Sequence, residues 1–457
     1  MLSNVSSSPF RSLLLFLVVS IQLTLAASVA QGEPTAIEER ADNGFSLSLK
    51  RNNLWDRSDR TPLENLEAQT KHMKSKYRQN FLAYHNNTGH CSPQMNSSIS
   101  IASLEARAFE EDVERSMHRR SSDKHGRSRL DARAGSKATV DLKATSGYVL
   151  WQGSLSVGTP AQSIKVTFDT GSADFVTNLG QYSAKKSSTS KNTGNKFSVY
   201  YADGTGETGY VYNETVTVGK SVAKKQAVGI PTWSSFDSSE PGLVGMAFES
   251  ISQMKRRPLV QNLFAQGAIP KAMFGVALSR DSGEAEMQLG GYHRAMIASG
   301  SSLKWNSVDN SGGFWVLDDV DVKMSRTLSG KTSTGSVTGR SAIMDTGTTL
   351  IYGPTADVKA LYEGANVTTV THGSSVYGYY SKTPNVTFSV GGVDYAIKDA
   401  AVSYTTASNG FKYGSIIGTD DLGLADGQWL IGDPWFSSVY SVFDITNTQM
   451  GLAAASY

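Results

Sequence analysis

"VTFDTGSADF" (Val166–Phe175) and "SAIMDTGTTL" (Ser341–Leu350) are the two stretches that decide the fold. In each, an acid ends an alternating β-type run and is followed by three small residues that are typical of a turn. The two acids, Asp169 and Asp345, lie 176 positions apart. A single acid before Thr-Gly is most often an ordinary Asx-type turn, but two copies in matching contexts indicate a shared role.

The duplication extends beyond the acids. Two apolar residues and a glycine follow each turn at a distance, as Leu243-Val244-Gly245 in the first half and Leu430-Ile431-Gly432 in the second. The same order of motifs therefore occurs twice. We expect two related lobes that face one another and bring Asp169 and Asp345 together.

Composition favours a large β-rich protein outside the nucleic-acid-binding classes. The chain has 457 residues, 43 of them Gly, and a formal net charge of only +2, with no basic stripe. Phe197–Gly219 predicts a hairpin with a Gly-rich tip, while Pro258–Pro270 and Pro354–Ala365 are the best helical windows of the two halves.

Two carboxylates across a cleft can share one proton, because two like charges at hydrogen-bonding distance cannot both ionise without a large cost. One then acts as a base toward a water while the other protonates a carbonyl oxygen, so that an amide is attacked without a covalent intermediate. The small neighbours suit this chemistry, because glycine N–H groups can bind the carboxylates, one threonine pair can lock the loops together, and two hydroxyls can bind the outer carboxylate oxygens. These supporting residues are Thr170, Gly171, Ser172, Thr346, Gly347 and Thr348.

"FDTGSAD", "MDTGTTL", "GLVGMAF" and "WLIGDPWFSSVYSVFDITNTQMGLA" resemble the active-site loops and apolar-apolar-Gly segments of pepsin-like (family A1) aspartic endopeptidases of the fungal secreted type. The resemblance runs from about Gly147 to the C-terminus. It implies a mostly β, bilobal, double-β-barrel fold with two related lobes around a central cleft, plus an α/β pro-segment. It also implies that Asp169 and Asp345 are the catalytic dyad and share a proton, a known property of this family.

The resemblance further implies a substrate-binding flap that carries Tyr201, Asp203 and Thr205. Two positions depart from the family's pattern. Val176 stands where a tryptophan commonly hydrogen-bonds the flap tyrosine, and Ala202 replaces the usual glycine. We expect an altered resting position of the flap with intact chemistry. Trp315 is interpreted as a core residue rather than a site residue.

The N-terminal third predicts export and a pro-segment. Residues 1–30 are typical of a signal peptide, with Arg11 before the apolar run Ser12–Ala26. A membrane anchor is the alternative, but the run is short and contains Gln22. We expect a pro-segment over residues 31–137, an N-terminal catalytic lobe over 138–304 and a C-terminal catalytic lobe over 305–457.

The pro-segment contains helical stretches at Pro62–Phe81 and Ser98–Arg120. In the resembling family, a pro-segment lysine pairs with both catalytic carboxylates and keeps the zymogen inactive. Lys76, followed by Tyr77, is our candidate, although Lys71 and Lys74 lie close in sequence. Arg119-Arg120 is either a dibasic processing site or a solvated linker.

The expected function is that of an aspartic endopeptidase, made as a zymogen, that hydrolyses peptide bonds at acid pH and prefers hydrophobic residues around the cut. It needs no cofactor and no metal. Its expected partners are polypeptide substrates and its own pro-segment, without nucleic acid or, after signal removal, membrane, and we expect a monomer. We expect secretion, with a vacuolar or lysosome-like compartment as the alternative, and glycosylation at Asn213, Asn366 and Asn385, with further sequons at Asn86 and Asn96.

Four other interpretations are open at this point. Glycosidases also use paired acids, but they predict neither the duplication nor a Gly near each acid. An aspartyl-phosphate enzyme would need a lysine that "MDTGTTL" lacks. A pepsin-like binding protein without activity is a third possibility, although both acids are present. Catalysis by Cys91, the single cysteine, is a fourth, but "GHCSPQMNSS" is polar and lies in the pro-segment.

Overall fold

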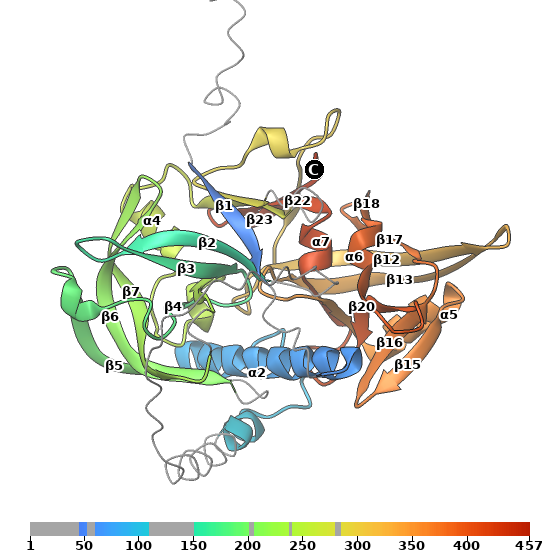
Figure 1. Cartoon of the computed structure of the whole chain (residues 1–457), viewed down its shortest axis with the longest axis horizontal. Helices are drawn as coiled ribbons and strands as arrows, with labels where there is room; N and C mark the ends of the chain where they lie inside the picture. Colours follow the sequence, from blue (N-terminus) through green and yellow to red (C-terminus); the bar gives the residue numbers. More distant parts are fainter. Residues whose placement is uncertain (1–44, 53–59, 109–149, 201–204, 237–239, 279–284) are drawn as a thin grey trace, which may run out of the picture.

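The computed structural model describes residues 45–52, 60–108, 150–200, 205–236, 240–278 and 285–457. Within these ranges the chain is mostly β and forms two large sheets with few helices (Figure 1). The predicted signal peptide lies outside the described residues, as do Arg119-Arg120, Tyr201, Ala202 and Asp203.

The first sheet has 13 strands and contains most of the first half of the body. In order across the sheet, its strands are β11 (Lys304–Ser307), β23 (Gln449–Ala454), β22 (Val439–Asp444), β9 (Met273–Leu278), β10 (Ala285–Leu289), β1 (Phe45–Asn52), β2 (Leu150–Val157), β3 (Gln162–Asp169), β8 (Gly242–Gly245), β4 (Phe175–Val176), β7 (Ser221–Ser234), β6 (Gly206–Val218) and β5 (Lys191–Tyr200). Two strands from the end of the chain, β22 and β23, thus belong to this sheet, and β1 lies between β10 and β2.

The second sheet has 10 strands and lies wholly in the second half of the body. Its strands, in order, are β15 (Thr368–His372), β16 (Ser375–Tyr380), β20 (Lys412–Gly418), β14 (Ile351–Gly353), β21 (Gln428–Ile431), β13 (Lys331–Met344), β12 (Val316–Leu328), β17 (Asn385–Val390) and β18 (Val393–Ile397), and β19 (Ser403–Thr406) pairs with β20.

The predicted duplication is visible in strand pairing. β3 runs parallel to β8, β8 antiparallel to β4, and β4 parallel to β7. β13, β21, β14 and β20 repeat the same sequence of parallel, antiparallel and parallel pairings. The first strand of each set leads into an acid turn, so each half presents its acid from the same local architecture.

The helices are few and mostly short: α2 (Pro62–Thr88), α4 (Leu259–Ala265), α5 (Thr355–Gly364), α6 (Asp399–Val402) and α7 (Asp433–Phe436). The predicted helical windows of the two halves are confirmed as α4 and α5. No helix among the described residues is both long and apolar enough to cross a membrane.

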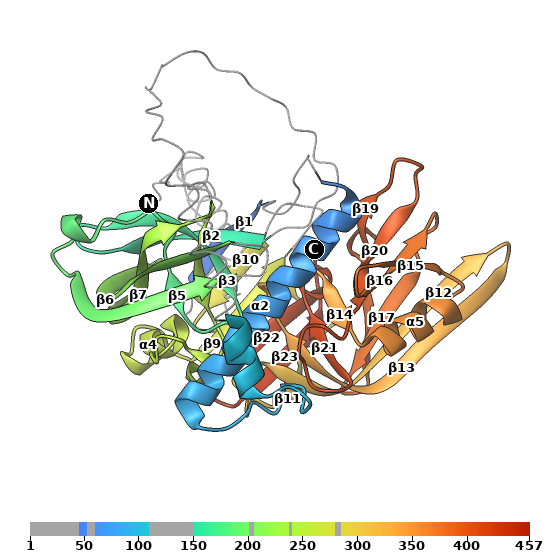
Figure 2. The ribbon, with the colours of Figure 1, turned by 90° about the horizontal axis from the view of Figure 1, so that it is seen from below.

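Helix α2 lies between the two halves of the body (Figure 2). It begins with a capping box, in which Thr61 accepts a hydrogen bond from the Glu64 backbone and the Glu64 side chain accepts one from the Thr61 backbone. It ends at Gly89, whose φ of 76° closes the last turn in the left-handed region. Residues 91–104 then follow the second half, where Met95 forms an isolated bridge with Leu424.

The main hydrophobic core is shared by both halves. Trp315 is fully buried, packs against Phe274 and Phe443, and donates a hydrogen bond to the Met246 carbonyl at 3.1 Å. Its predicted place in the core is therefore confirmed. A second buried cluster lies beneath α2 and continues across both halves.

Candidate active site

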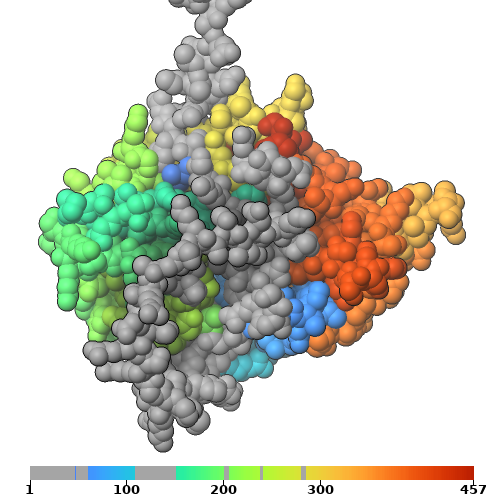
Figure 3. Space-filling model, viewed as in Figure 1, coloured from blue at the N-terminus to red at the C-terminus, as the bar shows by residue number. Residues whose placement is uncertain are grey.

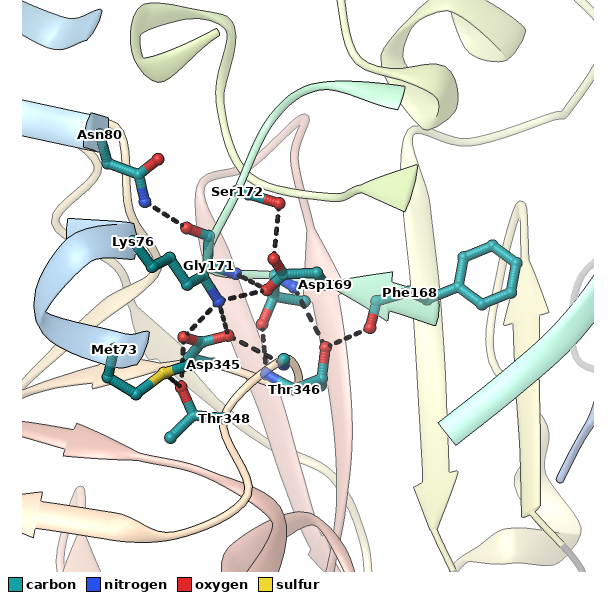
Figure 4. A network of polar contacts seen from close by, with 12 residues as sticks. Met73, Lys76, Asn80, Phe168, Asp169, Gly171, Ser172, Asp345, Thr346 and Thr348 are labelled. Atoms are coloured by element: carbon teal, nitrogen blue, oxygen red, sulfur yellow. Dashed lines mark hydrogen bonds and ion pairs between the residues drawn. The ribbon is translucent and has the colours of Figure 1, made fainter. Parts of the chain in front are cut away.

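Asp169 and Asp345 lie together where the two halves meet (Figure 4). Asp169 ends β3, Asp345 directly follows β13, and both side chains are buried. The Gly171 N–H donates to Asp169 Oδ1 and the Gly347 N–H to Asp345 Oδ1, each at 2.9 Å. Ser172 and Thr348 donate their hydroxyls to the respective Oδ2 atoms, each at 2.6 Å. The two acids therefore have equivalent environments, as the repeated motifs predict.

Two threonines join the acid loops. The Thr170 N–H donates to Thr346 Oγ1 at 3.1 Å, and the Thr346 N–H donates to Thr170 Oγ1 at 2.9 Å. Each hydroxyl then donates to a carbonyl of the opposite half, Thr170 to Met344 at 2.7 Å and Thr346 to Phe168 at 2.9 Å. Because all four groups are buried, this exchange fixes the two loops relative to each other.

The glycines next to the acids are required by close approach. A Cβ on Gly171 would lie 2.3 Å from Asp345 Oδ2, and one on Gly347 would lie 2.1 Å from Asp169 Oδ1. Each glycine thus makes room for the acid of the other half. Gly245 and Gly432, from the apolar-apolar-Gly segments, pack equally tightly, because a Cβ on them would lie 2.5 Å from the Ala173 backbone and 2.2 Å from the Thr348 backbone, respectively.

Lys76 of α2 lies between the two carboxylates. Its Nζ is 2.8 Å from Asp169 Oδ1, 2.8 Å from Asp345 Oδ2 and 3.1 Å from Asp345 Oδ1. The Tyr77 hydroxyl donates to Asp345 Oδ2 at 2.9 Å. The ammonium is buried and forms ion pairs with both acids.

The same face of α2 carries two contacts that sequence reasoning missed. Asn80 donates its side-chain amide to the Gly171 carbonyl at 2.7 Å, and the Thr348 hydroxyl points to Met73 Sδ at 3.0 Å (Figure 4). Met73 and Asn80 lie three and four residues from Lys76, which is the spacing of one helix face. That spacing could have identified both residues once Lys76 was chosen.

The sequence around the two acids is similar to that of known proteins. The family model described as eukaryotic aspartyl protease matches residues 150–455, which include both acid loops and both apolar-apolar-Gly segments. The chain belongs to the eukaryotic aspartyl protease family. It is therefore an aspartic-type endopeptidase, as the sequence motifs predict.

Relatives of this aspartic protease include an aspartic protease of Phaffia rhodozyma, 31% identical over 351 residues, which cover 72% of this chain and 82% of the relative. Secreted aspartyl protease 1 of Malassezia globosa is 29% identical over 335 residues, with 72% and 78% covered. Pepsin A of Bos taurus is 31% identical over 318 residues, with 66% and 83% covered. A solved structure, the aspartic proteinase from Irpex lacteus, matches with a TM-score of 0.55 at 22% identity and covers 69% of this chain and 98% of that one. It confirms the predicted pepsin-like fold.

Burial, Lys76 and the second acid determine the ionisation of the two aspartates. Burial raises the pKa of Asp169 to about 6, with the charge of Asp345 acting in the same direction and Lys76 opposing it. Burial also acts to raise the pKa of Asp345, but the Lys76 ammonium and the hydrogen bonds outweigh it and lower that pKa to about 2. The acids of this aspartic protease thus titrate as a coupled, asymmetric pair while Lys76 is present.

Lys71 and Lys74, the neighbouring lysines of α2, do not contact the acids. We use the word clamp for the contact of the Lys76 ammonium with Asp169 and Asp345. Lys71 pairs with Glu67 at 2.8 Å on the same helix, and Lys74 lies 3.6 Å from Asp421 of the second half. Among the three neighbouring lysines, only Lys76 reaches the acids of the aspartic protease.

The predicted flap lies only in part within the described residues. β5 and β6 form the predicted hairpin, and Thr205 lies half-buried just before β6. Val176 of β4 is buried in a cluster with Phe197, Val211, Ala227 and Met254. This cluster occupies the space beneath the hairpin where the resemblance implies an indole.

The three predicted glycosylation sites of the mature part differ in accessibility. Asn366 is exposed directly after α5, with a φ of 55°, and Asn385 is exposed at the start of β17. Asn213 is half-buried in the middle of β6, where it pairs with β5 and β7. Cys91 is exposed and unbridged.

Proposed function

We propose that this aspartic endopeptidase uses Asp169 and Asp345 as its catalytic dyad and is made as a zymogen that residues of α2 hold inactive. The single observation that carries the proposal is the Lys76 ammonium, buried between both carboxylates at 2.8 Å. A cation placed there occupies the position that a catalytic water needs. The proposal includes Thr170, Gly171, Ser172, Thr346, Gly347 and Thr348 as the residues that position the dyad.

The proposed reaction begins when Lys76 has left and the two carboxyl groups share one proton. The ionised carboxylate removes a proton from water as the water oxygen attacks the peptide carbonyl carbon, and the protonated carboxyl group donates its proton to the carbonyl oxygen. The tetrahedral intermediate, which carries two hydroxyl groups, then loses its amine: the amine nitrogen takes the proton of the dyad, and one hydroxyl of the intermediate returns its proton to the dyad as the carboxyl product forms. No bond forms between enzyme and substrate, and the proton count of the dyad is restored.

The proposed activation is driven by acid. Burial raises the pKa of Asp169 despite the nearby ammonium, whereas Lys76 and the hydrogen bonds hold the pKa of Asp345 below its ordinary value of 3.8, so Asp345 is the group whose ionisation stabilises the closed cleft. The contribution of Asp345 to closure is complete above about pH 4 and is lost as the pH falls toward about 2, where Asp345 takes up a proton in the closed cleft. Tyr77 adds a hydrogen bond that depends on an ionised Asp345.

The proposed substrates are polypeptides with large apolar residues around the cut. The buried cluster beneath α2 contains apolar side chains from both halves, among them Ala247 and Ile251 of the first half and Leu350 and Leu430 of the second. The pro-segment fills this space with apolar side chains of its own, including Leu66, Met73 and Phe81. A substrate would regain the same burial of apolar surface.

We further propose export to an acidic extracellular or vacuole-like location, with Tyr201, Asp203 and Thr205 in the flap. The names of two relatives, secreted aspartyl protease 1 of Malassezia globosa and cathepsin D of Dictyostelium discoideum, support this range of locations. The exposed Asn366 and Asn385 are the stronger candidates for glycans, and Asn213 the weaker one.

The test is digestion of a denatured protein at pH 3 to 5 by the acid-treated full-length chain. Digestion should stop with a statine-type inhibitor, whose hydroxyl takes the position of the water, and should be lost in Asp169→Asn and in Asp345→Asn. Asp174→Asn is the matched control, since Asp174 is buried on the same loop but bonds Ser252 and the Gln253 backbone. Full digestion by either dyad variant would overturn the proposal.

A further inference from the structure

The face of α2 that precedes Lys76 packs against three tyrosines of the second half. Tyr352 follows the second acid loop on β14, Tyr377 lies on β16 and Tyr404 on β19. All three belong to the buried cluster beneath α2, and their exposed fractions are 1%, 0% and 3%. In the space-filling view, the blue surface of α2 adjoins the orange-red surface of this half (Figure 3).

The pro-segment places polar atoms, not only apolar ones, against these rings. Gln69 donates its side-chain amide to the Tyr404 hydroxyl at 2.8 Å in a buried contact. Thr70 lies beside Tyr352 and Tyr377, whose pKa values are raised by burial, a rise that the Thr70 hydroxyl opposes. The tyrosines therefore present phenol groups to the helix at the bottom of an otherwise apolar wall.

The pairing at this position is incomplete. Among the described residues, the buried Tyr377 hydroxyl makes no hydrogen bond of good geometry, although Ser375 and Thr70 lie near it, and neither does Gln69 Oε1. A phenol both donates and accepts, so a carboxamide that reached Tyr377 and Tyr404 together could pair its oxygen with one and its nitrogen with the other. Gln69, held by its helix, makes only one of these two hydrogen bonds, the one from its amide nitrogen to the Tyr404 hydroxyl.

We infer that Tyr352, Tyr377 and Tyr404 form a side-chain pocket of the mature enzyme that selects glutamine, an apolar stem with a hydrogen-bonding end, over an aliphatic side chain of the same length. This inference rests on the proposed function, because substrate can enter the pocket only after α2 leaves the cleft. It adds one polar specificity position to an otherwise apolar cleft.

The position of the pocket follows from the helix. Gln69 precedes Lys76 by seven residues, so the pocket lies roughly 10 Å from the dyad along the helix axis. An extended substrate advances about 3.3 Å per residue, which places the selected side chain about three residues from the cut. An analogue that cannot hydrogen-bond there leaves the buried Tyr377 phenol without this partner, which lowers its kcat/KM relative to that of glutamine.

The experiment uses the acid-activated full-length chain and peptides with one fixed apolar pair at the cut. Each peptide carries either Gln or Met, which have similar length, at one position two to four residues from the cut on either side. The Gln peptide should be cleaved with a kcat/KM about five-fold above that of the Met peptide at one position, which corresponds to one net hydrogen bond. Tyr404→Phe should bring this ratio near one, and Tyr377→Phe should also lower the ratio.

The matched control is Tyr212→Phe, which removes a phenol from β6 in the other half, where Tyr212 accepts a hydrogen bond from Asn192. This variant should keep the Gln-to-Met ratio of the parent. Cleavage of the peptides without any preference for Gln, or a preference that survives both Tyr404→Phe and Tyr377→Phe, would overturn the inference and leave the proposed function standing. Absence of cleavage of every peptide would instead overturn the proposed function.

Discussion

At the scale of single residues, the position of each lysine on α2 decides whether its ammonium reaches the two acids or lies at the surface. Lys71, Lys74 and Lys76 lie within six residues, and the sequence alone could not decide firmly between them. Each residue turns the helix by about 100°, so the three point in different directions. Only Lys76 shares a face with Met73 and Asn80, whose contacts with the acid loops orient the helix.

Replacement of Lys76 by Ala should allow α2 to leave the cleft at a higher pH than in the parent protein. Without the ammonium, closure leaves two buried carboxylates unpaired, a change that typically costs about 3–5 kcal/mol. We expect activation of Lys76→Ala near pH 7 to be more than roughly ten-fold faster than that of the parent, whose rate should rise as the pH falls from about 4 toward about 2.

Active protease formed from the purified full-length chain would be measured over time between pH 7 and 2. Lys74→Ala is the control, since Lys74 lies at the partly exposed edge beside Asp421, and its profile should match that of the parent. Identical profiles for Lys76→Ala and the parent would remove Lys76 from the clamp.

At the scale of elements, local patterns predicted helices and hairpins better than they predicted ends and partners. α4 and α5 fall within the predicted windows because their apolar spacing and flanking prolines are local signals. The predicted end of α2 at Phe81 is too early, because "HNNTG" is typical of a turn. The helix continues to Thr88 and ends at Gly89. β1 was not predicted, since its partners β2 and β10 lie about 100 and 240 residues away in sequence.

The cluster beneath the flap hairpin gives a prediction for the departure at Val176. The family resemblance predicts that Val176→Trp lowers KM or leaves it unchanged. The packing adds a cost in stability, because Val176 is 2% exposed and Met254 Cε lies 2.6 Å from where a Cβ on neighbouring Gly229 would be. Overpacking of this kind typically costs about 1–3 kcal/mol.

Urea unfolding of the full-length chain at pH 7 would measure the free energy of unfolding of Val176→Trp. The double variant Val176→Trp/Met254→Ala should regain part of the loss, since both residues belong to the same cluster, whereas Met254→Ala alone should be destabilised. A Val176→Trp variant as stable as the parent would show that the space for an indole already exists.

At the scale of the whole molecule, the threonine exchange is the tightest polar connection between the acid loops of the two halves. Thr346→Val keeps the side-chain volume but leaves the Thr170 N–H and the Phe168 carbonyl without their partners. Since both groups are buried, we expect a loss of about 2 kcal/mol in the free energy of unfolding, together with a fall in kcat.

Thr349→Val is the control for this substitution, because Thr349 is buried on the same loop but takes no part in the exchange between Thr170 and Thr346. Unfolding at pH 7 and peptide hydrolysis after acid activation would be measured for both variants. Equal losses in the two would show that the exchange does not stabilise the junction.

The sequence predicted the duplicated plan of the molecule because each half carries its own acid turn and its own apolar-apolar-Gly segment. It did not predict that β22 and β23, from the end of the chain, join the sheet of the first half. Val442 and Phe443 belong to a short strand that is buried throughout, and its sequence does not indicate that its neighbour is β9. Long-range pairing is a property of the assembled whole.

In the proposed zymogen, cleavage that releases the pro-segment would also free β1 from the first sheet. This strand of the proposed pro-segment is hydrogen-bonded to β10 on one side and to β2 on the other. A cleaved chain that loses it would carry two open sheet edges, which readily recruit other strands. The freshly cut enzyme must therefore keep the strand as a separate peptide or fill the gap with another segment before neighbouring molecules do so.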